Sequence, residues 1–217
     1  KNNKNIIVEG FNTFDVIDSR IVFLDNKQWT SGINSLLKNT KNTNVTGFKI
    51  SGFPFIWSNK HKKYFWYYDT DFLLAQAIRT LPNSKWTKFL PFISCINNSR
   101  YSYDHINRLL KEHPKFWKGL GPIYLNTEYN EKVNRFAMET DSEHLKNIIL
   151  LAQEEKMPVA IDFSFRKPSK YYEFDDILDP EDEISYNRDL YEDSTGLFDL
   201  FNLYTNVNFI FHFEPVK

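Results

Sequence analysis

Cysteine is almost absent from this chain, which has one such residue in 217. A single cysteine excludes an intrachain disulfide and a metal cluster built from cysteines. Cys95 lies in the apolar run FISCI, and we interpret it as a small buried hydrophobic residue, with a catalytic thiol as the alternative. A glycine-rich phosphate loop is also missing after the first apolar run, Ile6–Val8, which weakens a dinucleotide-binding interpretation.

Long hydrophobic runs and a strong net charge are missing as well. No apolar run approaches the roughly 20 residues that span a bilayer. Basic and acidic residues number 27 and 28, so the net charge is −1, and composition favours neither nucleic acid nor a membrane as partner. The sequence shows no signal peptide. We therefore expect a cytoplasmic protein whose ligand, if it has one, is a small molecule.

Aromatic residues are abundant, at 17% of the chain, within a hydrophobic share of 41%. This composition is typical of a well-filled globular interior, and 217 residues are enough for one sizeable core. We therefore expect a single domain over residues 1–217.

Apolar strand segments alternate with amphipathic helices along the chain. Such an order is typical of a parallel sheet covered by helices, and a doubly wound sheet and an eight-fold barrel both fit it. The expected strands are Ile6–Val8, Val45–Ser51, Thr87–Ile96, Phe116–Ile123, Val159–Phe165 and Asn208–Phe213, with Ile21–Leu24 as an additional short strand. The expected helices are Ser31–Lys38, Asp69–Leu81, Ser102–His113, Thr140–Ala152 and Leu197–Tyr204.

Helix caps follow from the same pattern. Asp69 or Thr70 is expected to cap the second helix, and Thr140 with Glu143 matches a capping box before the fourth. The histidines on helices stand away from the strand ends, and we expect them at the surface; they are His105, His113 and His144.

Two polar residues stand near the ends of apolar strands, Asp162 in PVAIDFSF and His212 in NFIFHFEP. If the strands are parallel, both residues lie at one edge of the sheet. A carboxylate in a buried strand is costly unless it is paired or used, so Asp162 is either functional or held by a structural partner such as Lys118 or Arg166. His212 is either a hydrogen-bonded core residue or a ligand or acid/base group.

The aromatic and lysine-rich stretch FPFIWSNKHKKYFWYYDTD has two interpretations. It is either a loop that covers the sheet or a platform on which Trp57 stacks against a substrate ring. Lys118, near the start of the expected strand Phe116–Ile123, and Glu214, just after Asn208–Phe213, complete the candidate substrate-binding residues. The alternative is that Lys118 is solvated or paired and that Glu214 is an exposed strand end.

The stretch HPKFWKGLGPIYL, from His113 to Leu125, followed by MPVAIDFS and VNFIFHF, resembles the metal-dependent hydrolases of the amidohydrolase superfamily. In that family a fourth strand written p.f.G.GE precedes a helix, a fifth strand pv.lH.D and a sixth strand iI.aH. TGFKISGFPF and LPFISCI correspond to its second and third strands, so the likeness covers about Ile33 to Glu214. The resemblance implies a TIM-barrel-like (β/α) barrel with metal ligands at the carboxyl ends of the strands.

Most metal ligands of the family are replaced in this chain. The fourth-strand glutamate falls on Pro122 and the fifth-strand histidine on Asp162, while His212 matches the sixth-strand histidine. A zinc-type site needs about three protein ligands. We therefore expect either no metal or one divalent metal held by Asp162 and His212. The other ligand positions fall on Gly10, Asn12 and Ser164, and the eighth-strand aspartate has no counterpart.

Six strand–helix units do not close an ordinary barrel, and the edge strands need cover. Three explanations stay open: the natural chain extends beyond Lys217, a segment such as Ile21–Leu24 completes the sheet, or a second copy covers the edges in a homo-oligomer.

Two classes of function follow. The favoured one is a degenerate relative with a binding or regulatory role. The alternative is an active hydrolase of amide or ester bonds, with Asp162 as ligand or base and His212 as ligand or acid/base. A third, weaker option is a carbohydrate site built on Asp162 and Glu214.

Overall fold

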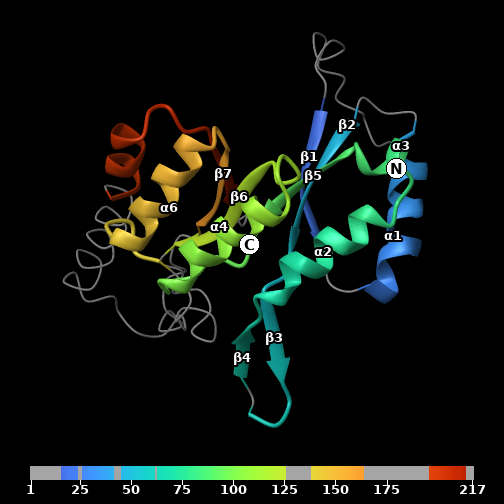
Figure 1. Ribbon diagram of the computed structural model, residues 1–217, viewed down its shortest axis with the longest axis horizontal. Helices are drawn as coiled ribbons and strands as arrows, with labels where there is room; N and C mark the ends of the chain where they lie inside the picture. Colours follow the sequence, from blue (N-terminus) through green and yellow to red (C-terminus); the bar gives the residue numbers. More distant parts are fainter. Residues whose placement is uncertain are drawn as a thin grey trace, which may run out of the picture.

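The computed structural model describes residues 16–23, 26–41, 45–61, 63–125, 138–163 and 196–213. A six-stranded parallel sheet forms its centre (Figure 1). Its strands, in their order across the sheet, are β1 (Val16–Phe23), β2 (Val45–Gly52), β5 (Phe89–Ile93), β6 (Gly119–Leu125), β7 (Val159–Phe163) and β8 (Phe209–Phe213).

The order of the strands bears on the two architectures that the sequence left open. A doubly wound sheet reverses its strand order at a switch point. Among the described strands the order follows the chain without reversal, which disfavours the doubly wound alternative. Among the described strands no pairing joins β8 back to β1, so the parallel α/β sheet is confirmed while the closed barrel stays a prediction.

The first expected strand, Ile6–Val8, lies outside the described residues and stays a prediction. The first described strand of the sheet is β1, which starts at Val16. The expected strand at Ile21–Leu24 is confirmed in part, because Ile21 to Phe23 form the end of β1 and pair with β2. The register of β1 on β2 is interrupted twice, between Val16 and Ile17 and between Asp18 and Ile21.

The helices connect the strands on the expected plan. They are α1 (Asn26–Asn39), α2 (Asp69–Arg79), α3 (Asn83–Trp86), α4 (Tyr101–Glu112) and α6 (Glu143–Glu154), and residues 196–203 are also helical. α2 packs on β2 and β5, α1 contacts α2, and α4 contacts α6. None of the described helices combines the length and the apolar character needed to cross a bilayer.

The residues predicted to cap α2 and α6 are both wrong. The residue before α2 is Tyr68, which makes no side-chain cap, and the Thr70 hydroxyl donates instead to the carbonyl of Phe53 at 3.2 Å. α6 is capped by Ser142, whose hydroxyl accepts from the backbone nitrogen of Leu145 at 3.1 Å. Serine is as good a cap as threonine, so the helix begins two residues later than the capping-box pattern predicts.

The core lies between the sheet and its helices. Strand residues of alternate positions, such as Phe48, Ile50 and Ile93, meet helical residues such as Leu74 and Ile106. The opposite face of the sheet is also buried, because Lys49 on β2 is only 3% exposed and its Nζ lies 5.1 Å from the Phe92 ring centroid. A parallel sheet buried on both faces explains why its strands read as continuous apolar runs.

The aromatic stretch after β2 forms an antiparallel hairpin, β3 (Phe55–Ser58) and β4 (Lys63–Trp66), which projects from the body of the protein (Figure 1). The stretch expected as a covering loop is therefore a β-hairpin over Phe55–Trp66, and its role as a substrate platform stays a prediction. Its base contacts the sheet, since the Phe55 ring lies 5.0 Å from Trp66 and 5.1 Å from Tyr124 on β6.

Candidate functional site

Asp162 and His212 occupy paired positions near the carboxyl ends of β7 and β8. The register of these parallel strands sets Asp162 opposite His212, and on its other side Asp162 is opposite Tyr124 of β6. Asp162 is partly buried, and only the backbone of His212 is described. Parallel pairing thus brings together the two residues that the sequence places at strand ends, and the structure adds Tyr124 to them.

The other candidate residues do not join this pair. Trp57 lies in β3, where it pairs with Tyr64, and its side chain is outside the described part, as is all of Glu214. Lys118 is exposed just before the first residue of β6, and its Nζ donates to the carbonyl of Lys115 at 2.7 Å. Lys118 therefore lies at the amino edge of the sheet, opposite the edge that carries Asp162.

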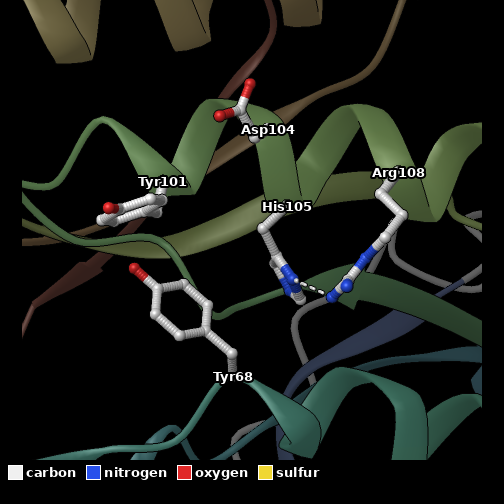
Figure 2. A pocket seen from close by; sticks show the side chains of 5 residues that line it. All are labelled: Tyr68, Tyr101, Asp104, His105 and Arg108. Atoms are coloured by element: carbon white, nitrogen blue, oxygen red, sulfur yellow. Dashed lines mark hydrogen bonds between the residues drawn. The ribbon is translucent and has the colours of Figure 1, made fainter.

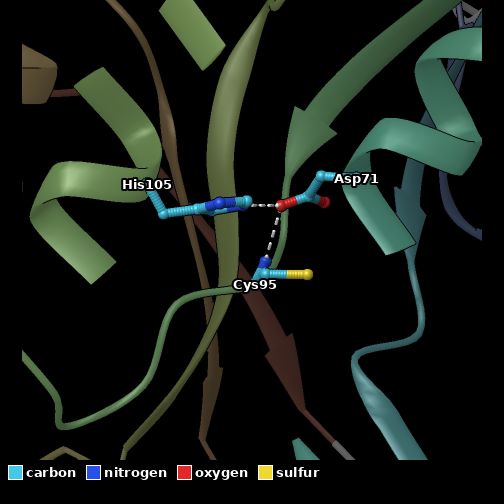
Figure 3. A group of neighbouring side chains, drawn as sticks. All are labelled: Asp71, Cys95 and His105. Atoms are coloured by element: carbon cyan, nitrogen blue, oxygen red, sulfur yellow. Dashed lines mark hydrogen bonds and ion pairs between the residues drawn. The ribbon is translucent and has the colours of Figure 1, made fainter. Parts of the chain in front are cut away.

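A buried polar group that the sequence pattern does not single out lies at the carboxyl end of β5 (Figure 3). Asp71, in the first turn of α2, is fully buried. Its Oδ1 accepts from the backbone nitrogen and the hydroxyl of Ser94, at 3.0 and 2.9 Å. Its Oδ2 accepts from the backbone nitrogen of Cys95 at 3.0 Å and meets His105 Nε2 at 2.9 Å. We call these four residues the Asp71 cluster; they link α2, the end of β5 and α4.

The hydrogen bonds of His105 define its tautomer. Arg108 Nη2 lies 3.4 Å from His105 Nδ1, and a guanidinium can only donate, so Nδ1 is the acceptor. The ring proton is then on Nε2, which donates to Asp71. The imidazole is thus held at both nitrogens, and its only lone pair faces a cation. This arrangement suits a positioning role better than proton abstraction, because a base must be free to take up a proton.

Cys95 completes the cluster without acting as a thiolate. Burial, followed by the charge and hydrogen bonding of Asp71, raises the pKa of the Cys95 thiol well above its usual value. Its Sγ lies 3.3 Å from the carbonyl of Tyr67, to which the thiol donates. A protonated, fully buried thiol is a poor nucleophile, so the catalytic alternative for Cys95 is disfavoured and the small-hydrophobe interpretation fits its 0% exposure.

The Asp71 cluster has the residue types of a metal site but not the free atoms. One ligand atom each from Asp71, Cys95 and His105 lies within 4.8 Å of the others. A metal on Nε2 would displace the proton to Nδ1, where it would face the N–H groups of Arg108. Both carboxylate oxygens already accept two hydrogen bonds each. The donor set therefore fits an internal hydrogen-bond network better than a resident metal.

The metal ligands implied by the family resemblance fit no better among the described side chains. Pro122 is buried in β6, where the family has a glutamate, and a proline side chain has no atom that ligates a metal. Asp162 is the one family position on which a potential ligand side chain is described. One carboxylate is fewer than the roughly three protein ligands of a catalytic zinc.

A cavity of about 320 Å³ opens beside His105 (Figure 2). Tyr68 approaches it from the start of α2, and the other described residues that line it come from α4: Tyr101, Asp104, His105 and Arg108. The Tyr68 ring lies 5.1 Å from the His105 ring, and its hydroxyl is bound to Asn97 Oδ1 at 3.2 Å. The cavity therefore has aromatic walls and a fixed histidine at its base.

The expectation that His105 is a surface residue is wrong, because its side chain is 5% exposed. A signal was present in the sequence. Ser102 and His105 share the i, i+3, i+4, i+7 stripe of Ile106 and Leu109, and Asp71 occupies the same stripe as Leu74 and Ile78. A polar residue within an apolar helical stripe must be buried and needs a partner, and here two such residues are each other's partner.

Comparison of the chain with protein-family models, with curated proteins and with solved structures finds no match.

Proposed function

We propose that this chain is a divergent relative of the amidohydrolase-type (β/α) barrels that binds a small molecule at the carboxyl edge of its sheet. In this proposal the inherited metal site is degenerate, and the protein has a binding or regulatory role. Parallel strands in chain order, with polar residues at their carboxyl ends, are compatible with this barrel type.

The observation that carries the binding role is the cavity beside His105. Ligand sites in proteins are typically cavities of about 300–1,000 Å³ with apolar and aromatic walls and a few oriented polar groups. Here two tyrosines form the walls, and Asp71 holds His105 in one orientation by the 2.9 Å bond to Nε2. A preorganised wall of this kind lowers the entropy cost of binding.

A hydrolase remains the second candidate because of the register at β7 and β8. Asp162 and His212 are directly paired, and residues on neighbouring strands that face the same edge can share a water molecule or a metal. In this version Asp162 is a ligand or general base and His212 a ligand or acid/base group, acting on an amide or ester bond.

Metal analysis separates the two candidates. The full chain, its Asp162→Ala variant and its His212→Ala variant are dialysed with and without Zn²⁺, and bound metal is measured by mass spectrometry. Binding without hydrolysis predicts less than stoichiometric metal in all three proteins. Stoichiometric metal in the wild type that is lost in both variants would overturn the proposal of a degenerate metal site and would favour the hydrolase.

A fragment screen by ligand-observed NMR tests the binding role directly. Small ring compounds are expected to bind the wild-type protein and to lose affinity when His105 is replaced by Phe, which keeps a ring but removes both hydrogen bonds. The matched control is His144→Phe, because His144 lies on α6 and does not line the cavity. A screen in which no compound binds the folded wild-type chain contradicts the proposal.

A further inference from the structure

We infer, resting on the proposed binding function, that the cavity between α2 and α4 selects a planar ring that carries one anionic group, with Arg108 as the residue that receives the anion. Two observations support this: the placement of Arg108, and the aromatic walls on the other side of the cavity. Neither belongs to the strand-end pair of Asp162 and His212.

Arg108 has a fixed orientation and no carboxylate partner among the described residues. Its guanidinium lies 4.7 Å from the Phe72 ring centroid, and Nη2 contacts His105 Nδ1 at 3.4 Å. Asp104 stands one helical turn before Arg108, a spacing at which such residues commonly form an ion pair. No ion pair forms here, and Figure 2 shows the two side chains pointing apart.

The contacts of Arg108 leave its guanidinium able to bind a planar anion. A guanidinium has five N–H donors, and stacking on Phe72 together with one contact to His105 leaves most of them available. A carboxylate or similar planar anion binds such a fork through two parallel hydrogen bonds. The orientation of His105 is set by Asp71, which binds the other ring nitrogen. Asp104 is the one carboxylate among the described residues that line the cavity, and its side chain points away from Arg108 (Figure 2).

The aromatic residues that line the cavity indicate which chemical group of the ligand carries the anion. Tyr68 is held by the 3.2 Å bond from its hydroxyl to Asn97, so its ring is presented in one position. Tyr101, on α4, lines the same cavity with a side chain that is 59% exposed, and the Arg100 guanidinium lies 5.3 Å from its ring centroid. Tyrosine rings favour flat apolar groups, which stack on them or meet them edge to face. A volume of about 320 Å³ suits a ligand of one or two rings.

The experiment uses the full chain and three probes of similar size: benzoate, benzamide and cyclohexanecarboxylate. Benzoate has both the ring and the charge, benzamide lacks the charge, and cyclohexanecarboxylate lacks the flat ring. Calorimetry or saturation-transfer NMR is expected to rank benzoate first. Benzamide should bind roughly tenfold more weakly, as the loss of a charged hydrogen bond implies. Cyclohexanecarboxylate keeps the charge but should also bind more weakly, because it has no flat ring to stack on the tyrosines.

Variants then locate the site. Arg108→Gln is expected to weaken benzoate by roughly tenfold and to leave benzamide unchanged, because only the charged contact is lost. Lys111→Gln removes one positive charge from the same helix without touching this cavity, and is expected to leave both unchanged. Tyr101→Leu should weaken benzoate and benzamide together. Circular dichroism checks folding, and Arg108→Lys, which keeps the charge but not the fork, replaces Arg108→Gln if that variant is unfolded.

The outcomes distinguish this inference from the function on which it rests. Equal affinity for benzoate and benzamide, or benzoate binding that survives Arg108→Gln, overturns the assignment of the anion to Arg108. If the affinity for ring compounds falls in Asp162→Ala but not in Arg108→Gln, the proposed binding function stands, and the assignment of the ligand to the cavity between α2 and α4 is overturned. Failure of every ring compound to bind overturns both.

Discussion

The Asp71 cluster and the Asp162–His212 pair both contain a carboxylate and a histidine near carboxyl ends of the sheet, yet their environments differ. Asp71 is fully buried and accepts hydrogen bonds from three residues. Asp162 is partly exposed and stands on β7, one strand from the described edge of the sheet. The difference teaches that residue type alone does not identify a reactive site. A fully buried carboxylate that accepts several internal hydrogen bonds stabilises the fold, whereas a partly exposed carboxylate is accessible to a ligand.

The largest effect is expected from Asp71→Ala. The substitution leaves the backbone nitrogens of Ser94 and Cys95 and the His105 ring without their acceptor in a buried position. Breaking such a charged network costs about 3–5 kcal/mol of unfolding free energy, to be measured by urea denaturation. Asp69→Ala, on the exposed side of the same helical turn, is the control and should change stability by less than about 1 kcal/mol. If Asp71→Ala loses little unfolding free energy, the Asp71 cluster does not differ in structural role from the Asp162–His212 pair.

Gly121→Ala is expected to have the next largest effect, because Gly121 joins β6 to the strand that carries Asp162. Its φ is +105°, and an added Cβ would collide with the backbone carbonyl of Ala160 on β7. Strain and overpacking together should cost about 2–4 kcal/mol in the same denaturation assay. Gly32→Ala has the opposite expectation, a gain of about 0.5–1 kcal/mol, because a Cβ added to that helical glycine on α1 would meet no other atom within 4 Å. A tolerated alanine at 121 would show that β6 can shift relative to β7.

Asp162→Asn measures the second region directly. Because Asp162 is only partly buried, the substitution should change the unfolding free energy by about 1 kcal/mol or less. Thermal and urea denaturation of Asp162→Asn and Asp71→Asn, side by side, give the comparison. A loss at position 162 as large as that at position 71 would make Asp162 a structural residue like Asp71.

The smallest effect is a dependence of stability on alkaline pH. The pKa of Cys95 is raised in the folded protein above the usual thiol value of 9.0, so the unfolded chain loses this proton first. The contribution to stability is complete below about pH 9 and falls as pH rises from 9 through the folded pKa. Urea denaturation between pH 7 and 10 should show this decline, and Cys95→Ala should reduce it. An identical decline in the variant would assign it to other groups.

Several elements of the fold were predictable from local pattern. Val159–Phe163 coincides with an apolar run, because a strand buried on both faces must be apolar at nearly every position. Phe209–Phe213 is also an apolar run, although its described side chains are only partly buried. The helices follow from apolar spacing. The hairpin Phe55–Trp66 was missed because its aromatic residues pack at its own base and on Tyr124, which a loop-like composition conceals.

By itself the sequence determined the alternation of strands and helices, the parallel sheet and the placement of positions 162 and 212 at one edge of that sheet, since each follows from periodicity and from parallel pairing. Only the tertiary structure decided the order of the strands and the partnership of Asp71 with His105. These residues are 34 positions apart on different helices, and their meeting depends on how α2 and α4 pack beside β5. The reason is physical: periodicity reports which side of a helix is buried, whereas the identity of a buried polar partner depends on the packing of separate elements.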